Sequence, residues 1–357
     1  MSLQSLDICQ FRNLHQVNIN TDAGLNIITG LNAAGKTSLL EAIFYLSYGR
    51  SFRSSQTRDL IENHQDFFRL VSKIKSSQRI HTLGIQKSTK DQTIRIDQQN
   101  ISSLSELSTL LPVIALHPDS HQLIAAGPEF RRQYLDWGVF HVEHAFIKSW
   151  KDYRKALSQR NAALRTNQPD KICSLWHQAI SENAEKINLY RLAYLEQLEQ
   201  SLDLISSTLF ENNRVGLEYK RGWSDEMDYQ GYLEHNLQKD REKGFTQAGP
   251  HRADLKIRLD DKSAQTSISR GQQKKLVTLL KLAQLDVFVK NSDKTCILLF
   301  DDLPAELDRA NRRILMEMLS SINVQLFVTA IEVEQLDCSA WDHYKRFHVE
   351  HGVISEI

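Results

Sequence analysis

The chain has 357 residues, with 44 basic and 44 acidic side chains and a formal net charge of zero. This length allows a sizeable buried core, and a composition of 41% hydrophobic and 25% charged residues excludes extensive disorder. The 4 cysteines lack a Cys-x-x-Cys pair, the N-terminus lacks a secretory signal, and no apolar run is long enough to span a membrane. We therefore expect a cytoplasmic protein without a membrane partner.

The N-terminal part is predicted as strands and loops around one helix. An apolar strand at 25–29 ends in Gly30, and a helix follows at 37–48 with apolar residues at helical spacing. Further strands are expected at 17–20, 93–97 and 111–116. The pattern indicates the first portion of an α/β sheet.

The middle of the chain is predicted to be helical. From about residue 127 the strand pattern disappears, and after a turn signal at 166–170 a long helix is expected to reach about Asn212. Its leucine-rich positions are spaced three and four apart, at Leu195, Leu198, Leu202, Ile205 and Leu209. Two helices around one turn predict an antiparallel hairpin, either a short coiled coil or a helical subdomain with a buried stripe.

The C-terminal part returns to strands and helices. Helices are predicted at 272–290 and 305–320, and buried strands at 295–300 and 325–329. Strands that alternate with helices imply an α/β fold with parallel strands, into which the helical segment is inserted. The expected domains are residues 1–120 and 245–357, which together form an α/β lobe with a mixed sheet, and an inserted helical lobe at 121–244.

A phosphate-binding loop follows the first apolar strand. Its glycines allow a tight curve, so that backbone N–H groups point at the phosphates beside the N-terminus of the next helix. Lys36 would reach the β and γ phosphates of ATP, and Thr37 would bind Mg²⁺. The predicted nucleotide-binding residues are Gly30, Leu31, Asn32, Ala33, Ala34, Gly35, Lys36, Thr37 and Ser38.

Two adjacent carboxylates follow the apolar run at 297–300. Carboxylates at the end of a buried strand face the phosphate crevice of an α/β sheet. We expect Asp301 to hold magnesium and Asp302 to polarise the attacking water as general base. An ordinary strand capped by surface acids would give the same pattern, but the preceding loop favours the catalytic interpretation.

A third motif precedes the helix predicted at 272–290. It comprises Ser269, Arg270, Gly271, Gln272 and Gln273. Ser269 is also a plausible N-cap. The motif resembles the Ser-Gly-Gly-Gln signature of ATP-binding-cassette proteins, which contacts the γ-phosphate of ATP held by a second subunit. By the same resemblance, 305–308 is similar to the D-loop, and Thr329 stands where many relatives place a switch histidine.

Five stretches together resemble the RecF family of bacterial recombination proteins. They occur in family order over nearly the whole chain, at 30–43, 249–254, 269–274, 301–308 and 325–331. Two details depart from the family pattern: Asn32 is followed by alanine rather than glycine, and 116–119 differs from the usual Pro-Glu-Asp. Because alanine is small, we expect ATP binding to survive.

The resemblance implies an ATP-dependent DNA-binding protein that dimerises around two nucleotides. It implies action at gapped DNA with RecR and RecO to help load RecA, in recombinational repair, replication and the SOS response. We expect a slow ATPase in which Ser269, Lys36 and Asp302 act on ATP. A structural clamp with negligible hydrolysis is the alternative, while a transporter ATPase or a small-molecule kinase fits the motifs less well.

Basic residues in the helical segment are candidates for DNA contacts. Aromatic residues are interleaved with them, as phosphate contacts and base stacking require. The candidates for DNA binding are Arg131, Arg132, Lys151, Arg154 and Lys155, with Lys148, Arg160 and Arg165 in the same run. A solvated helix face with Tyr134, Trp150 and Tyr153 in the core explains the pattern equally well.

Two smaller groups are less specific. Arg50 and Arg53 follow the first helix and could contact nucleotide, DNA or only solvent. His141 and His144 lie one helical turn apart, but no further ligand stands at a suitable spacing, so we interpret them as surface histidines rather than a metal site.

Overall fold

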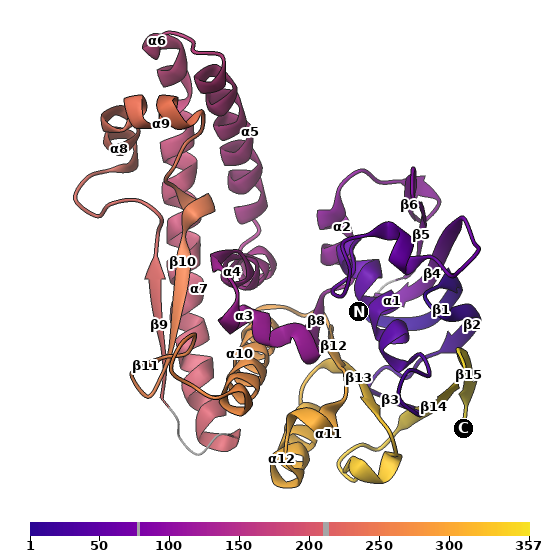
Figure 1. The fold of residues 1–357 in the computed structure, drawn as a ribbon. Helices are drawn as coiled ribbons and strands as arrows, with labels where there is room; N and C mark the ends of the chain where they lie inside the picture. Colours follow the sequence, from indigo (N-terminus) through magenta and orange to yellow (C-terminus); the bar gives the residue numbers. More distant parts are fainter. Residues whose placement is uncertain (77–78, 210–213) are drawn as a thin grey trace. The chain divides into compact units, whose positions relative to one another are not determined.

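The computed structural model describes residues 1–76, 79–209 and 214–357. The chain divides into two compact units (Figure 1). Residues 1–120 and 289–357 make up most of the first, here called the ATPase unit, and most of the remainder makes up the second, here called the helical unit. Across the described ranges no helix is both long and apolar enough to cross a membrane.

A mixed sheet positions the residues predicted for a nucleotide site in the ATPase unit. Its strand order is β15-β14-β3-β13-β12-β8, with β15 antiparallel to β14 and the other pairings parallel. The bounds are β3 Leu25–Thr29, β8 Val113–Leu116, β12 Cys296–Phe300, β13 Val324–Ala330, β14 Tyr344–Glu350 and β15 Val353–Glu356. Every residue of β3, β8, β12 and β13 is buried, which explains why their sequences are mostly apolar rather than alternating.

A second, antiparallel sheet has the order β2-β1-β4-β5-β6-β7. Its bounds are β1 Ser2–Phe11, β2 Leu14–Asn20, β4 Phe67–Lys75, β5 Ile80–Ser88, β6 Gln92–Ile96 and β7 Gln99–Asn100. Helix α1, Lys36–Tyr48, packs in one hydrophobic core with residues of both sheets. It is buried nearly all round, because residues of both sheets pack against it.

Shorter helices complete the ATPase unit. They are η1 Thr57–Leu60, α2 Leu104–Leu110, η2 Pro118–His121, α11 Leu303–Glu306, α12 Arg309–Ser320 and η5 Val333–Gln335. The prediction of one helix at 305–320 was therefore wrong in detail. The chain breaks between α11 and α12 because Asp308 caps α12, its Oδ1 accepting from Asn311 N at 3.0 Å. Helix α2 was also missed.

The buried amide of Gln325 joins the two sheets. Its Oε1 accepts from Leu3 N at 2.8 Å, and its Nε2 donates to Leu3 O at 2.8 Å and to Asp22 O at 2.7 Å. Gln325 lies on β13 and is fully buried. One side chain thus satisfies backbone groups of β1 and of the turn that follows β2.

The helical unit consists of helices and a small antiparallel sheet, β11-β10-β9. Its helices are α3 Gln122–Ala125, α4 Pro128–Val142, α5 Phe146–Arg165, α6 Asp170–Cys173, η3 Ser174–Trp176, α7 His177–Leu209, α8 Tyr229–His235, α9 Leu237–Lys243, η4 Pro250–Arg252 and α10 Arg270–Asn291, of which α10 ends in the ATPase unit. Its strands are β9 Val215–Lys220, β10 Asp254–Leu259 and β11 Lys262–Ser263.

The leucine-rich stripe of α7 is buried at Leu195, Leu198, Leu202 and Ile205. The side chain of Leu209 and all of Asn212 lie outside the described residues. Ser201, on the same helix, donates to Asp286 Oδ2 of α10 at 2.5 Å. The stripe therefore packs within a helical subdomain that includes α10. α5 and α7 run in opposite directions and form the predicted hairpin, connected by the short helices α6 and η3 (Figure 1).

The second predicted boundary differs from the structure. Residues 245–288 group with the helical unit rather than with the ATPase unit. Strand β10 pairs with β9 along its whole length, and Arg131 of α4 forms an ion pair with Asp254 at 2.7 Å. These contacts tie the segment to the helices that precede it.

Candidate nucleotide-binding site

The phosphate loop connects β3 to α1, as predicted. Gly30 and Gly35 have φ of 146° and 128°, which side-chain-bearing residues rarely adopt. A Cβ on Gly30 would lie 2.3 Å from Val349 O, so a side chain cannot be accommodated there. Leu31, Asn32 and Ala33 are exposed, while the following residues are buried against the unit. The loop therefore presents its tip to solvent.

Ala33 has a left-handed backbone conformation with φ of 63°. This is the position where alanine follows Asn32 in place of glycine. A left-handed conformation costs an L-residue roughly 1–2 kcal/mol. The loop is thus compatible with alanine by size, but it carries local strain that glycine would avoid.

Asn13 braces the loop from the turn between β1 and β2. Its Nδ2 donates to Ala34 O at 3.1 Å, and its Oδ1 accepts from Ser38 Oγ at 2.8 Å. Gly352 N donates to the same Ala34 carbonyl at 2.9 Å. Sequence reasoning missed Asn13, because its role depends on contacts that only the folded chain creates.

Lys36 lies inside the curve of the loop. Its Nζ donates to Gly30 O at 2.6 Å and to Leu31 O at 3.0 Å. Burial lowers the pKa of Lys36, while the charges of Asp302 and Asp301 act in the opposite direction. The ammonium is therefore held among the backbone groups that would surround a polyphosphate.

Thr37 and Asp301 meet, although 264 positions separate them in the sequence. Thr37 Oγ1 donates to Asp301 Oδ2 at 2.8 Å. Burial raises the pKa of Asp301, and hydrogen bonds from Thr329 and Thr37 partly offset it. A hydroxyl and a carboxylate oxygen are ligands that suit Mg²⁺, which commonly takes its remaining ligands from phosphate and water. The donor set fits the predicted metal.

Asp302 follows at the end of β12 in a left-handed conformation, with φ of 55° and ψ of 52°. Its N–H donates to Thr329 Oγ1 at 2.7 Å. Its charge raises the pKa of Lys36, so the predicted base lies close enough to the phosphate loop to interact with it electrostatically. Lys36, Thr37, Asp301 and Asp302 are therefore gathered in one place in the ATPase unit.

Ser269 begins α10 with reciprocal capping bonds. Its Oγ accepts from Gln272 N at 3.3 Å, and its N–H donates to Gln272 Oε1 at 2.9 Å. The capping role and the phosphate role do not conflict, because the hydroxyl that accepts from Gln272 N still has its own O–H to donate. Arg270 and Gly271 are exposed beside it, and Gln273 donates to Ala264 O at 3.5 Å. These residues belong to the helical unit.

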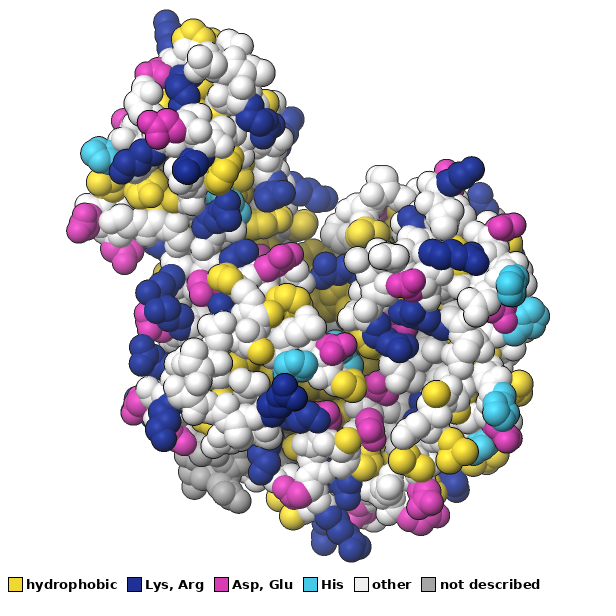
Figure 2. All heavy atoms as spheres, in the orientation of Figure 1, with side chains coloured by type: hydrophobic (Ala, Val, Ile, Leu, Met, Phe, Trp, Pro, Cys, Tyr) yellow, Lys and Arg dark blue, Asp and Glu magenta, His cyan; other side chains and the backbone are white. Residues whose placement is uncertain are grey.

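The basic run divides into buried and exposed members. Arg131 is buried, bonded to Asp254 and to Ala126 O at 2.9 Å, so its prediction as a DNA contact was wrong. Arg132 is half-buried and donates to Ala253 O at 2.7 Å. The exposed members are Lys148, Lys151, Arg154, Lys155 and Arg165. Lys and Arg side chains gather along α5 in the space-filling view (Figure 2).

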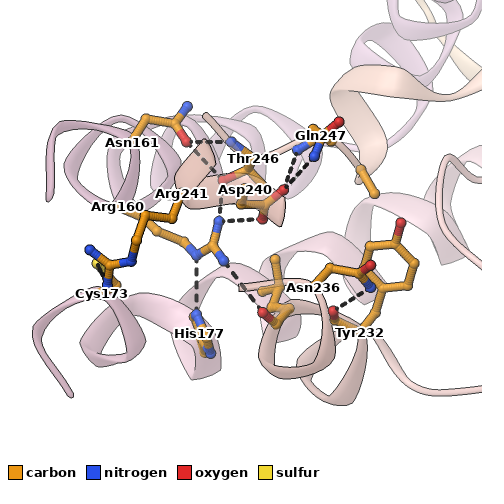
Figure 3. A network of polar contacts seen from close by, with 12 residues as sticks. Arg160, Asn161, Cys173, His177, Tyr232, Asn236, Asp240, Arg241, Thr246 and Gln247 are labelled. Carbon is orange, nitrogen blue, oxygen red and sulfur yellow. Dashed lines mark hydrogen bonds and ion pairs between the residues drawn. The ribbon is translucent and has the colours of Figure 1, made fainter. Parts of the chain in front are cut away.

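Arg160, from the same run, lies in a fully buried network (Figure 3). It donates to His177 Nε2 at 3.1 Å, to Asp240 Oδ2 at 2.8 Å and to Thr246 Oγ1 at 2.6 Å. Tyr134 and Tyr153 are buried as well. This part of the run is structural.

The remaining sequence candidates lie outside this arrangement. Arg53 is paired with the buried Glu41 of α1 at 3.5 Å, and Arg12 binds the same carboxylate at 2.6 and 2.9 Å. His141 packs against Trp137 and Phe288 and is only partly exposed, which corrects the prediction of a surface residue. Among the residues that the structure describes, no three His, Cys, Asp or Glu side chains cluster as a metal site.

The mixed sheet, the loop between β3 and α1 and the carboxylates beyond β12 have the arrangement of the ATP-binding-cassette ATPase fold. Residues 2–355 match the family described as RecF/RecN/SMC N terminal domain. The chain is 43% identical over 356 residues to the DNA replication and repair protein RecF of Thioalkalivibrio sulfidiphilus, and 37% identical over 356 residues to that of Vibrio parahaemolyticus. Each match covers 99% of both proteins.

Solved structures agree with these relatives. The recombination mediator protein RecF-ATP of the RecFOR pathway is 25% identical, with a TM-score of 0.89 over 99% of both chains. An Smc head domain from Pyrococcus furiosus is 15% identical, with a TM-score of 0.58 over 100% of this chain and 96% of that one, and shares the fold. The chain belongs to the RecF family, whose relatives serve DNA replication and repair.

Proposed function

We propose that this protein binds ATP and magnesium and forms an ATP-dependent homodimer on DNA. The arrangement of Ser269 carries the proposal. It lies exposed at the start of a 22-residue helix, in a different compact unit from Lys36. Its free O–H and the helix N-terminus suit a phosphate oxygen supplied by a second copy. Two loops and two Ser269 motifs would then enclose two nucleotides.

Hydrolysis in this dimer would use the carboxylates at the end of β12. Asp301 and Thr37 would hold magnesium, which would neutralise phosphate charge, and Lys36 would bind the β and γ phosphates. Asp302 would orient and deprotonate the attacking water. The grouping of these four residues favours a slow ATPase over a clamp with negligible hydrolysis.

DNA would bind along the exposed face of α5. This helix contains six basic residues and one acidic residue, although the whole chain has no net charge. Lys151, Arg154 and Lys155 lie on adjacent turns and are exposed. Such a stripe suits the phosphate backbone rather than base edges, because it carries charge without a fixed hydrogen-bond pattern.

The biological role would be that of a recombination mediator in the cytoplasm. A solved relative is named as a recombination mediator of the RecFOR pathway. We propose that this protein likewise acts at gapped DNA with RecR- and RecO-type partners, helps load RecA on single strands, and so serves gap repair, replication and SOS induction.

The proposal is tested by oligomeric state and DNA binding. Wild type should sediment as a dimer with ATP and Mg²⁺ and as a monomer without them, and Ser269→Ala should stay monomeric while still binding ATP. Thr266→Ala, in the exposed segment just before the motif, is the matched control. Dimerisation of Ser269→Ala at wild-type ATP concentrations would refute the shared site.

DNA affinity should fall with salt, since cationic contacts release counterions. Replacing Lys151 and Lys155 by glutamine should lower the slope of log affinity against log salt by about 2. Lys186→Gln, exposed on α7, is the control and should leave the slope unchanged. An unchanged slope in the double variant would mean that Lys151 and Lys155 do not contact DNA phosphates.

A further inference from the structure

The hydroxyl of Thr329 lies between the two carboxylate residues of the nucleotide site. Thr329 is fully buried near the end of β13. Because β13 runs parallel to β12, with Val328 opposite Phe300, the next residues along the two strands are Thr329 and Asp301. The register of the sheet therefore brings this hydroxyl to the carboxylates without any help from a loop.

Both hydrogen-bonding functions of the hydroxyl are used. Thr329 Oγ1 donates to Asp301 Oδ1 at 2.8 Å and accepts from Asp302 N at 2.7 Å. The other oxygen of Asp301 accepts from Thr37 at 2.8 Å. Each oxygen of the carboxylate thus has its own hydroxyl donor, one from β13 and one from α1, and this fixes the plane of the group.

The second contact acts on the backbone of Asp302. An aspartate with φ of 55° is in a conformation that L-residues disfavour. A hydrogen bond from its N–H to a buried acceptor stabilises that conformation. Without this bond the N–H would be shielded from water and have no hydrogen-bond partner. Thr329 therefore acts on the orientation of both carboxylate residues.

We propose that Thr329 is a positioning residue for ATP hydrolysis, holding Asp301 as the magnesium ligand and Asp302 as the base. This inference rests on the proposed ATPase function. Its role is geometric: a threonine hydroxyl does not change protonation near neutral pH, so it cannot act as the histidine found in many relatives would. Its effect reaches ATP only through the two carboxylates.

The test compares Thr329→Val with Thr329→Ser. Valine keeps the shape and removes both hydrogen bonds, whereas serine keeps the hydroxyl. We expect valine to lower kcat by about tenfold or more while KM changes by less than about threefold, and serine to retain most of the wild-type kcat. Wild-type kcat in the valine variant, or equal loss in both variants, would overturn the inference.

A matched control separates positioning from general stability. Thr21 is a buried threonine of the same unit whose Oγ1 donates to Leu3 O at 2.5 Å. Thr21→Val should lower the melting temperature without lowering kcat. If Thr21→Val reduces kcat as much as Thr329→Val does, the effect at Thr329 is not positional.

A second readout does not require turnover. The Mg²⁺ concentration for half-maximal ATP binding should rise about fivefold or more in Thr329→Val and stay near wild type in Thr329→Ser. If wild type binds ATP but shows no hydrolysis, the proposed ATPase function fails, and this titration still decides whether Thr329 orients Asp301. Equal Mg²⁺ requirements in both variants would contradict the inference.

Discussion

Arg160 offers a sharp test of the buried network in the helical unit. Arg160→Met removes the guanidinium while keeping an unbranched apolar chain of similar reach. Asp240, which is 2% exposed, then loses its bond from Arg160 at 2.8 Å. Removing one partner of a buried ion pair costs about 3–5 kcal/mol, because an uncompensated charge stays behind. We expect a loss of unfolding free energy in this range.

The double variant identifies the source of that loss. In Arg160→Met with Asp240→Asn no buried charge remains at the pair, so part of the stability should return, giving a coupling energy of about 1–3 kcal/mol. Arg165→Met, exposed at the end of the same helix, should change stability by less than about 0.5 kcal/mol.

The assay is guanidinium denaturation, combined with amide hydrogen exchange of α5, α8 and α9 to locate the weakened region. Two results would refute the reasoning. One is an Arg160→Met variant as stable as wild type. The other is a coupling energy of zero in the double variant, which would mean that the loss does not come from the pair with Asp240.

Three further changes test other features. Asp301→Asn should weaken the Mg²⁺-dependent part of ATP binding by about tenfold or more, measured by titration with and without EDTA, and equal affinity to wild type would remove Asp301 from the metal site. Ala33→Gly should stabilise the protein by up to about 1 kcal/mol in urea, whereas Ala33→Val should destabilise it, because β-branched residues tolerate φ of 63° least. Burial lowers the pKa of His251 to about 4, below its ordinary value of 6.5. Its stabilising contribution is therefore present above pH 6.5 and lost as the pH falls toward 4, and melting temperatures should drop less over that range in His251→Gln than in wild type.

The parts of the fold that follow local rules could be predicted from the sequence. β3 and β12 are short, mostly apolar runs followed directly by glycine or aspartate, so their type and their C-terminal ends were predicted correctly. β1, β4 and β5 were missed. Burial alternates along β4 and β5, but buried polar residues such as Ser72 and His81 interrupt the apolar pattern in the sequence. β1 also depends on its pairing with β4, more than fifty positions away.

The residues of the candidate nucleotide site also divide into those with a local sequence signal and those defined by distant contacts. The residues of the phosphate loop are consecutive, and Asp301 follows a strong strand signal. Arg131 was misassigned because its partner, Asp254, is 123 positions away and nothing local indicates that pairing. The same reason hides Asn13 and its bond to Ala34. The sequence of a basic run shows how many charges it contains. Which of those side chains are exposed and can contact a ligand depends on the folded structure.

The bridge from Gln325 to Leu3 constrains how the chain can fold during synthesis. It joins groups 322 positions apart, and the two neighbours of β3 in its sheet, β13 and β14, both come from the last 34 residues. During synthesis, β3 cannot pair with β13 and β14 until nearly the whole chain has left the ribosome. The helices encoded between β3 and β13 can pack before that point. A stalled or truncated product would expose the apolar strand of the nucleotide site without its partners, so this half of the molecule should be the part most dependent on chaperones.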